Sequence, residues 1–395
     1  MPTGWGTCGY KGSDHHTLPS RATGFVAPEY CAGAHCQQRD MMHGILLINI
    51  GSTSTKVGFF SGKGTLIKKA ISHSAKDLAR LHGYDVWLRF HLNTVEKILQ
   101  RHKKEFEKIN LIVSRGGLTK PVEGGAYSIN DAMLHDLCSG KYGWHPCNVG
   151  PAIAYEIAKR FEVKAIIYDS PVADEMEPLA RFSGLKEIER KAAFHVLSQK
   201  SAARKAAKEL GISYEQSNLI VAHLGGGITI GAHKGGKIID GTHGLSEGPL
   251  TPQRTGALPL EDVLSLCYSR GFSEKELRRK LFSRGGVESY LGTHDIASVE
   301  LRAGKGDEEA ILVLKAMGYQ ICKAICSMAA VLEGHIDAVV LTGNLCLSKS
   351  LIGEIRNRVS FLGPLFIYPG EDELECLARG GLAVLRGEED LREYT

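Results

Sequence analysis

Short apolar runs separated by glycine-rich turns occur with the same layout in both halves of this chain. The first run, ILLINI at residues 45–50, has the length and composition of a buried strand and leads into a turn at Gly51–Lys56. Apolar residues return at 57–60, and a second turn follows at 61–64. This pattern predicts a hairpin of two strands.

The second copy begins with LIVAHL at residues 219–224 and turns at Gly225–Gly227. It returns through 228–233 and turns again at 234–237. The interval from Gly51 to Gly62 equals the interval from Gly225 to Gly236. Two matching hairpins predict two related halves that face each other across a cleft.

A longer apolar pattern lies between residues 308 and 332, where apolar side chains recur at helical spacing from Ile311 to Met328. This stripe predicts a helix whose apolar face packs in the core or against a second copy of the chain.

Residues 1–41 differ from the rest, because they are rich in Gly, Pro, Cys and His and show no helical or strand period. We expect a disordered extension there. The alternative is a metal site, but its candidate ligands match no zinc spacing; they are Cys31, His35 and Cys36 with His15 or His16.

Composition argues against several classes of protein. The 395 residues carry a formal net charge of +4, too mild and too evenly spread for a nucleic-acid-binding protein. No apolar run reaches the roughly 18 residues that suggest a membrane span, and no secretory signal is recognisable. We therefore interpret the ten cysteines as reduced thiols and expect a cytoplasmic protein without a membrane or nucleic-acid partner.

The chemistry of the two turns fits an anionic ligand. Glycines let backbone N–H groups approach phosphate oxygens, and we expect Gly226 to be such a position. Residues 52–55 are all Ser or Thr and would add hydroxyl donors, and Lys56 adds a positive charge. The alternative is two ordinary tight hairpins, since Gly and Ser are common turn residues.

The sequence does not match two other nucleotide-binding motifs, the P-loop and the dinucleotide-binding motif. Residues Gly231 to Lys237 have the form G-x-x-x-x-G-K, but Ile238 follows and the strand pattern continues, whereas a P-loop needs Ser or Thr opening a helix. No G-x-G-x-x-G stands between a strand and a helix, so a dinucleotide fold is unsupported.

Seven runs, in order, resemble the butyrate kinases of the acetate/butyrate kinase branch in the actin, hexokinase and Hsp70 ATPase superfamily. They are NIGSTSTK, VSRGGL, DSPVADEMEPLARFSG, AFHVLSQK, VAHLGGGITIGAH, TPQRTGALPL and AVVLTGNL. The resemblance implies an α/β fold of two related ribonuclease H-like, actin-like ATPase domains facing each other across a nucleotide cleft. It implies domain bounds of 42–186 plus 371–395 and 187–370, with the last helix returning to the first domain.

The resemblance also implies an activity. It is a reversible phosphoryl transfer from ATP, with Mg²⁺, to the carboxylate of butyrate, catalysed by a homodimer or larger homo-oligomer. Three alternatives stay open. One is a kinase for isobutyrate, propionate or acetate. Another is a regulatory or chaperone-like ATPase, and the third is a non-catalytic homologue, suggested by Asn344 and the short 244–248 loop.

Site residues follow from the matched motifs. As catalytic residues the resemblance implies Arg115, Arg254, His195 and Asp169. The nucleotide or phosphate would be bound by Asn49, Ser52, Ser54, Lys56, His223, Gly225, Gly226, Gly227, Gly343 and Asn344. His145 and Asn148 would contact the acid, and Glu373 would hold Mg²⁺ through water.

The residue types suit the chemistry. A carboxylate with a pKa near ~4–5 is ionised at neutral pH and needs no general base, so the enzyme must offset repulsion between two anions. Arg115 and Arg254 would clamp the anions, and His195 would donate a hydrogen bond to the transferring phosphoryl group. Asp169 would orient one arginine. Each of these residues has a structural alternative, such as a loop pin for Arg254 or a turn former for Asp169.

Overall fold

The computed structural model describes residues 44–61, 64–106, 108–269, 271–370 and 372–395. All of them belong to one unit of internal contacts, Asp40–Thr395. The expected extension at 1–41, with its alternative metal ligands, lies outside the described residues.

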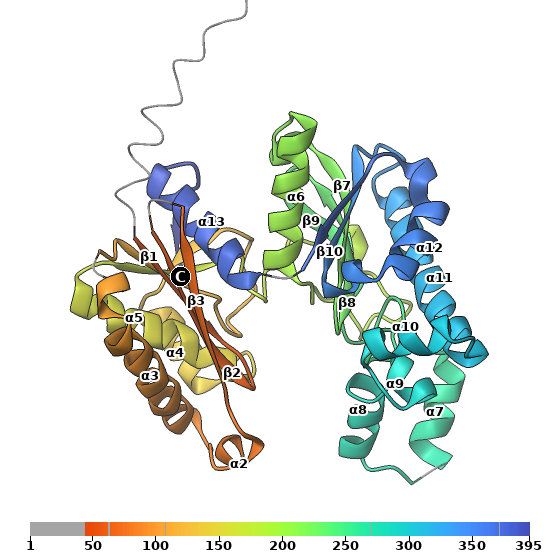
Figure 1. Cartoon of the computed structure of the whole chain (residues 1–395), viewed down its shortest axis with the longest axis horizontal. Coiled ribbons are helices and arrows are strands. Elements are labelled where there is room, and N and C mark those ends of the chain that lie inside the picture. The colour runs from red at the N-terminus through yellow and green to blue at the C-terminus, as the bar shows by residue number, and fades with distance from the viewer. Residues whose placement is uncertain (1–43, 62–63, 107, 270, 371) are drawn as a thin grey trace, which may run out of the picture. The chain divides into compact units, whose positions relative to one another are not determined.

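The first sheet has seven strands in the order β12-β5-β6-β4-β1-β2-β3. Figure 1 labels β1, β2 and β3 of this sheet. The strand β1 runs antiparallel to β2 and parallel to β4, and β4 runs parallel to β6. The strand bounds are Ile45–Ile50 (β1), Ser54–Phe60 (β2), Leu66–Ser72 (β3), Leu111–Ser114 (β4), Ala126–Ser128 (β5), Lys164–Tyr168 (β6) and Leu391–Glu393 (β12).

The second sheet repeats the core of the first, in the order β11-β10-β7-β8-β9. Here β7 is antiparallel to β8 and parallel to β10, and β10 is parallel to β11. The order and directions match β6-β4-β1-β2-β3, which confirms the predicted repeat. The strand bounds are Asn218–Leu224 (β7), Ile228–Lys234 (β8), Lys237–Gly241 (β9), Ala338–Gly343 (β10) and Leu365–Pro369 (β11).

The first turn is shorter than predicted. The turn was expected at 51–56, but β2 already begins at Ser54, and Lys56 pairs with Asn49 across the two strands. The hairpin closes earlier because Thr55 is fully buried and Ser54 and Thr55 take extended, paired conformations.

Two helices cross from one sheet to the other. Helix α6 (Val196–Leu210) follows β6 of the first sheet in the chain, yet it packs on β7 and β10 of the second. Helix α13 (Glu373–Arg386) follows β11 but packs on β1 and β4, as the resemblance implied for the last helix. The division into two domains at the expected bounds stays a prediction.

Each of the other helices belongs to one half of the chain. The first half contains α2 (Ala75–Leu78), α3 (Tyr84–Arg101), α4 (Asp131–Ser139) and α5 (Val149–Phe161). The second half contains α7 (Leu260–Ser269), α8 (Glu274–Phe282), α9 (Gly286–Leu291), α10 (Ile296–Gly304), α11 (Glu308–Val331) and α12 (Lys349–Val359).

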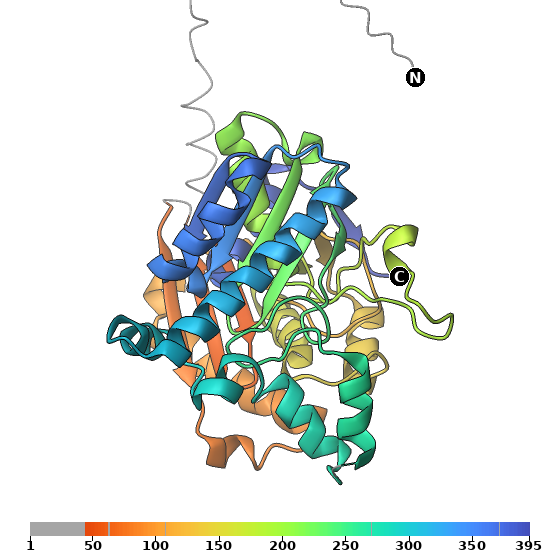
Figure 2. The ribbon, with the colours of Figure 1, turned by 90° about the vertical axis from the view of Figure 1, so that its right-hand side faces the viewer.

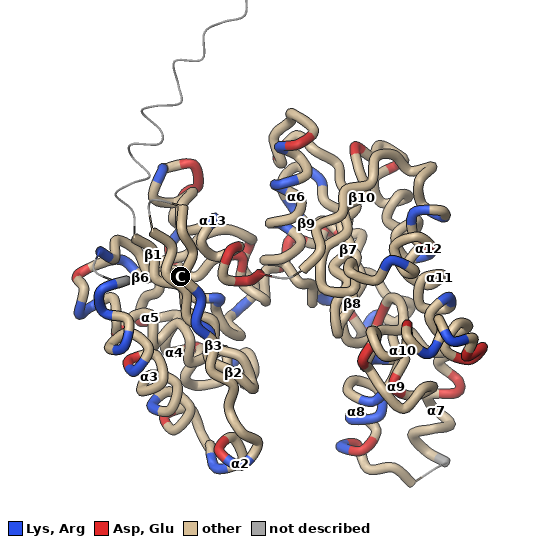
Figure 3. The backbone as a smooth tube through the Cα atoms, in the orientation of Figure 1, with Lys and Arg blue, Asp and Glu red and all other residues tan. Residues whose placement is uncertain are grey.

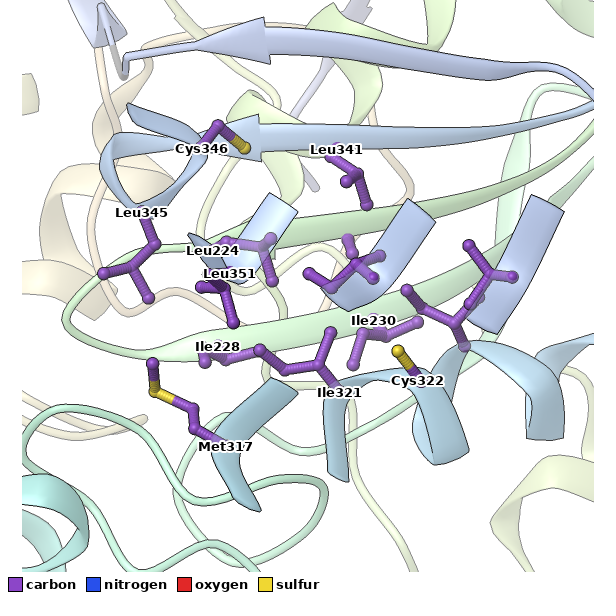
Figure 4. Packing of buried hydrophobic residues seen from close by; sticks show 14 of the residues in the cluster. Leu224, Ile228, Ile230, Met317, Ile321, Cys322, Leu341, Leu345, Cys346 and Leu351 are labelled. Carbon is purple, nitrogen blue, oxygen red and sulfur yellow. The ribbon is translucent and has the colours of Figure 1, made fainter. Parts of the chain in front are cut away.

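Helix α11 is a core helix. It crosses the face of the second sheet (Figure 2), and Met317, Ile321 and Cys322 pack against Ile228 and strand neighbours from β7, β8 and β10 (Figure 4). Among the described residues α11 alone is long and apolar enough to cross a membrane by length and composition. Of the two predicted roles for this stripe, packing in the core or against a second copy of the chain, its burial within the chain agrees with the first.

The topology gathers loops at one edge of each sheet. Parallel strands end at the same edge, so the segments after β1, β4 and β6 lie together, as do those after β7, β10 and β11. Arg115 directly follows β4, and its backbone N–H donates to the carbonyl of Ile48 in β1. The glycine turns, Arg115, Asp169 and Gly343 therefore all occupy the edges where the strands end.

Candidate active site

The Glu373 carboxylate is the centre of a polar cluster in the first half. The Asn49 side-chain amide donates to its Oε2 at 2.5 Å, and Arg115 Nη2 lies 3.1 Å from its Oε1. The Lys56 ammonium lies 3.8 Å from Oε2. Four residues that motif matching proposed separately, from β1, β2, the end of β4 and the start of α13, thus meet at one carboxylate.

Only some of the hydroxyl groups in and after the first glycine turn are accessible to a ligand. Ser52 is exposed and Ser54 half-buried, so both are accessible to a ligand. Thr55 was expected to be a further donor, and this was wrong. Its hydroxyl is fully buried and lies 2.8 Å from His73 Nε2 and 2.6 Å from His91 Nδ1. Thr55 therefore ties the hairpin to α3 instead of facing a ligand.

In the second half, two histidine rings stack. The ring centroids of His195 and His223 are 3.9 Å apart, and the two ring planes form an angle of 16°. His195 Nδ1 lies 2.9 Å from the Thr229 hydroxyl, and His223 Nδ1 lies 2.9 Å from the Ser198 hydroxyl. A Cβ on Gly225 would stand 2.9 Å from His223 Nε2, so the glycine is needed for this close approach.

Arg254 lies against the second glycine turn. A Cβ on Gly227 would overlap its guanidinium group, whose Nη1 donates to the carbonyl of Gly244 at 2.7 Å. The Thr251 hydroxyl connects this loop to the turn, since it donates to the carbonyl of Gly226 and accepts from the Arg254 backbone N–H. The short 244–248 loop noted in the sequence thus directly supports the arginine.

Gly226 meets no group of the protein that requires a glycine, and its predicted approach to phosphate stays a prediction. It is exposed, its φ is not positive, and a Cβ there would meet only Gln253 Oε1, at 3.7 Å. The position that requires glycine is Gly227, because of the arginine packed on it.

The charges of both arginines act on the same ring. Burial, followed by the charges of Arg254 and Arg115, lowers the pKa of His195 to about 3. Burial, followed by His195, Arg115 and Arg254, also holds the pKa of His223 well below its ordinary value. Both rings are therefore neutral at pH 7. The Glu373 cluster and the stacked rings thus belong to one electrostatic environment with two fixed positive charges.

Asp169 does not orient either of the two expected arginines. It is buried, with a φ of 42°, and its carboxylate binds Arg204 Nη1 of α6 at 2.7 Å and the N–H of Gly125 at 2.9 Å. Asp169 therefore connects the end of β6 to helix α6.

The two proposed acid-binding residues differ. Burial, and then the charge of Arg115, lowers the pKa of His145, so its ring lies near the site. Asn148 is fully buried, and backbone groups use both ends of its amide: Oδ1 accepts from the N–H of Leu118, and Nδ2 donates to the carbonyls of Leu137 and Gly143. The proposed acid contact of Asn148 is therefore contradicted, because its amide holds the loop after Arg115.

Gly343 ends β10 with a φ of 98°, and a Cβ there would overlap the carbonyl of Leu224. Asn344 does not have a positive φ, and it opens a 3₁₀ turn, η5 (Asn344–Leu347). Asn344 is exposed and lines a pocket of about 440 Å³ together with Thr342, Ser198 and Asp372.

Motif reasoning missed Gln199 and Thr229. Gln199 Nε2 donates to the Thr229 hydroxyl at 2.7 Å, behind the ring of His195. Two signals in the sequence pointed to them. Gln199 stands four residues after His195 on a helix, hence on the same face. Thr229 follows Gly225 by four residues, as Thr55 follows Gly51.

Among the described residues, no group of three or more His, Cys, Asp or Glu could hold a metal ion by itself. Mg²⁺ in kinases is commonly held by one or two carboxylates together with substrate phosphate oxygens. Glu373 is the single candidate carboxylate, and because Asn49, Lys56 and Arg115 already surround its oxygens, it would hold the ion through water. Lys and Arg are interleaved with Asp and Glu along both halves (Figure 3).

Comparison with known proteins gives a sequence match and a fold match. Residues 182–364 match the model of the acetokinase family. The acetate kinase of Porphyromonas gingivalis superposes with a TM-score of 0.70 at 18% identity, over 87% of this chain and 100% of that one. A propionate kinase of Francisella tularensis gives 0.66 at 20% identity, over 86% and 99%.

The acetate kinase of Entamoeba histolytica gives 0.64 at 16% identity, over 85% and 98%. These likenesses confirm the predicted actin-like α/β fold. By sequence over residues 182–364 and by fold over most of its length, this chain is thus similar to the acetate kinases.

Proposed function

We propose that this protein transfers a phosphoryl group between ATP and the carboxylate of a short-chain fatty acid, with butyrate as the preferred acid. The observation that carries the proposal is the pair of arginines: Arg115 lies at the Glu373 carboxylate, Arg254 packs on the second glycine turn, and the charges of both lower the pKa of His195. The match of residues 182–364 to the acetokinase family supports the same class of reaction.

The reaction needs little proton chemistry. An oxygen of the ionised acid attacks the γ-phosphorus, a new O–P bond forms, and the bond to the β–γ bridging oxygen breaks, its electron pair leaving with ADP. Arg115 and Arg254 would offset the repulsion between the two anions and stabilise charge on the equatorial oxygens. His195, being neutral, would donate one hydrogen bond without adding a third charge.

Mg²⁺ would supply charge neutralisation between the β- and γ-phosphates. Glu373 is the residue that would hold it, and Asn49 and Lys56 fix the position of that carboxylate. The exposed Ser52 and half-buried Ser54, with the backbone of Gly225–Gly227, would bind phosphate oxygens, and the segment Gly343–Asn344 would lie next to the nucleoside.

The test is to trap the acyl phosphate with hydroxylamine in the presence of ATP, Mg²⁺ and a series of acids from acetate to valerate. We expect butyrate or isobutyrate to exceed acetate in kcat/KM roughly tenfold, because each buried CH₂ contributes about 0.8 kcal/mol. Equal rates with acetate would instead make this an acetate or propionate kinase. ATP turnover without acyl phosphate would favour a regulatory or chaperone-like ATPase. A homo-oligomeric state and a cytoplasmic location stay predictions.

A further inference from the structure

Behind His195 runs a continuous chain of buried hydrogen bonds. The Tyr214 hydroxyl lies 2.8 Å from His233 Nδ1, and His233 Nε2 lies 3.0 Å from Gln199 Oε1. Gln199 Nε2 is 2.7 Å from the Thr229 hydroxyl, which is 2.9 Å from His195 Nδ1. Gln199, Thr229 and His233 are fully buried and Tyr214 nearly so, so water does not compete for these contacts.

The direction of this chain is set by one backbone carbonyl. The same Gln199 nitrogen that contacts the Thr229 hydroxyl also donates to the Thr229 carbonyl oxygen at 3.4 Å. A flipped amide would place two acceptors, the Gln199 oxygen and this carbonyl, against each other. The NH₂ group therefore faces Thr229, and Gln199 Oε1 accepts the proton of His233 Nε2. His233 Nδ1 then accepts from the Tyr214 hydroxyl.

The proton positions follow at the other end. The Thr229 oxygen accepts from Gln199 Nε2 at 2.7 Å and from the His195 backbone N–H at 3.4 Å, which uses both of its lone pairs, so its own proton is directed to His195 Nδ1. A neutral imidazole has one N–H, and when Nδ1 accepts, the proton is on Nε2. We propose that this relay fixes His195 in the Nε2–H form, which makes Thr229 and Gln199 positioning residues for the proposed phosphoryl transfer.

The surrounding charges support a neutral relay. Burial, followed by the charges of Lys200 and Arg204, holds the pKa of His233 well below its ordinary value, and the pKa of His195 is lowered as described above. Neither ring takes a second proton at pH 7. The catalytic use of His195 rests on the proposed function, but its tautomer is a property of the free protein and can be measured without substrate.

The first hairpin provides a matched control. Thr55 occupies the equivalent position, four residues after Gly51, and its buried hydroxyl also contacts imidazole nitrogens. Those rings belong to His73 and His91, in the first half of the chain. Thr55→Val therefore removes the same group from the same kind of hairpin without touching the Tyr214–His195 relay.

The experiment is a long-range ¹H–¹⁵N correlation on the full chain labelled at histidine, with the His195 signals assigned from their loss in His195→Gln. We expect a protonated Nε2 and a bare Nδ1 in the wild type at pH 7. Thr229→Val should change the His195 nitrogen shifts, Thr229→Ser should restore them, and Thr55→Val should leave them in place. A His195 proton on Nδ1 in the wild type, or Thr229→Val shifts equal to wild type, would overturn the proposal.

Kinetics on the same variants separate the relay from the proposed function. Thr229→Val should lower kcat for acyl phosphate formation by about tenfold or more with a smaller change in KM for ATP, and Thr229→Ser should recover most of it. If Thr229→Val keeps the kcat of wild type, the relay has no positioning role. If the wild type makes no acyl phosphate but shows the Nε2–H form, the proposed function fails and the relay stands.

Discussion

At the scale of single residues, the site combines fixed positive charges with rings that are kept neutral. Arg115 is half-buried against Glu373, and Arg254 is packed on Gly227. Guanidinium groups keep their charge at any physiological pH, whereas burial beside them prevents His195 from becoming a cation. This division suits a reaction between two anions, in which charge must be constant and the hydrogen-bond donor must not titrate.

Arg254→Ala should lower kcat by about 10³-fold and raise KM for ATP far less, because contacts made in the transition state appear in kcat. Arg254→Lys should stay poor, since an ammonium does not reproduce the planar fork. The measurement is steady-state acyl phosphate formation, with Arg278→Ala as the control, because Arg278 is exposed and pairs only with Glu274 among the contacts described. A lower melting temperature with a wild-type kcat would instead identify Arg254 as a loop pin.

Gly227→Ala should displace the Arg254 guanidinium and reproduce most of the kcat loss of Arg254→Ala. Gly226→Ala, one residue earlier, has open space for its Cβ and should lose far less activity. The double variant Gly227→Ala/Arg254→Ala should be no slower than Arg254→Ala, because the collision disappears with the side chain. Additive losses in the double variant would contradict this explanation.

At the scale of elements, helix α6 connects the site to the first sheet. Its first turn contributes His195 as the N-cap residue and Ser198, which binds His223. Further along, Lys200 pairs with Glu175 at 2.6 Å with both side chains buried, and Arg204 pairs with Asp169. Glu175 also accepts from the N–H groups of Gly124 and Ile238. The helix that positions the histidines is therefore held by two ion pairs to segments that follow β6.

Lys200→Met should lower the free energy of unfolding by about 3 kcal/mol or more, because removing one partner leaves the Glu175 carboxylate buried without its cation. Chemical denaturation measures this loss. The control is Lys237→Met, which breaks the exposed pair with Glu123 and should cost less than about 1 kcal/mol. Equal losses in the two variants would show that burial of the Lys200 pair has no particular effect.

The contact between β2 and α3 predicts a pH dependence of stability. Burial, followed by the charge of His73, lowers the pKa of His91 to about 4, whereas an unfolded histidine titrates near 6.5. As the pH falls, His91 takes up its proton in the unfolded state before it does so in the folded state. The folded state is therefore most favoured, as far as His91 is concerned, above about pH 6.5, and it loses about 3 kcal/mol of stability as the pH falls toward 4. In His91→Gln, the free energy of unfolding should change less with pH between 6.5 and 4 than in the wild type. An unchanged pH dependence would show that His91 is not its source.

At the scale of the whole molecule, two copies of one sheet topology exchange their last helices. Because α6 packs on the second sheet and α13 on the first, neither half has its full set of packed elements without the other. Glu373, at the start of α13, therefore joins Asn49, Lys56 and Arg115, although hundreds of residues separate them in the chain. The exchange of helices is what completes the site.

Starting the chain at Met42 should leave acyl phosphate formation and the melting temperature unchanged within error. The reason is that the composition changes before Gly44, and strand β1 begins at Ile45. The measurement compares the truncated and full chains under the same assay. A clear loss of activity or stability in the truncated protein would show that the extension is part of the structure.

The sequence by itself determined the repeat and much of the site. Strands β1, β7 and β8 and helix α11 follow from local apolar periods, which depend only on neighbouring residues. Glycine turns at equal intervals predicted two related halves because a local turn signal does not depend on distant packing. Motif matching alone also pointed to Asn49, Lys56, Arg115 and Glu373, which meet in the structure at one carboxylate.

Only the tertiary structure decided which polar residues contact each other. The partner of Asp169 is Arg204, and Asn148 and Thr55 are turned inward, because hydrogen-bond partners are chosen by the packing of segments far apart in the chain. The same holds for the relay behind His195, which joins residues from η4 (Tyr214–Gln216), α6 and β8. Local sequence fixes which residues face inward, and the meeting of two sheets through exchanged helices fixes what each buried polar group binds.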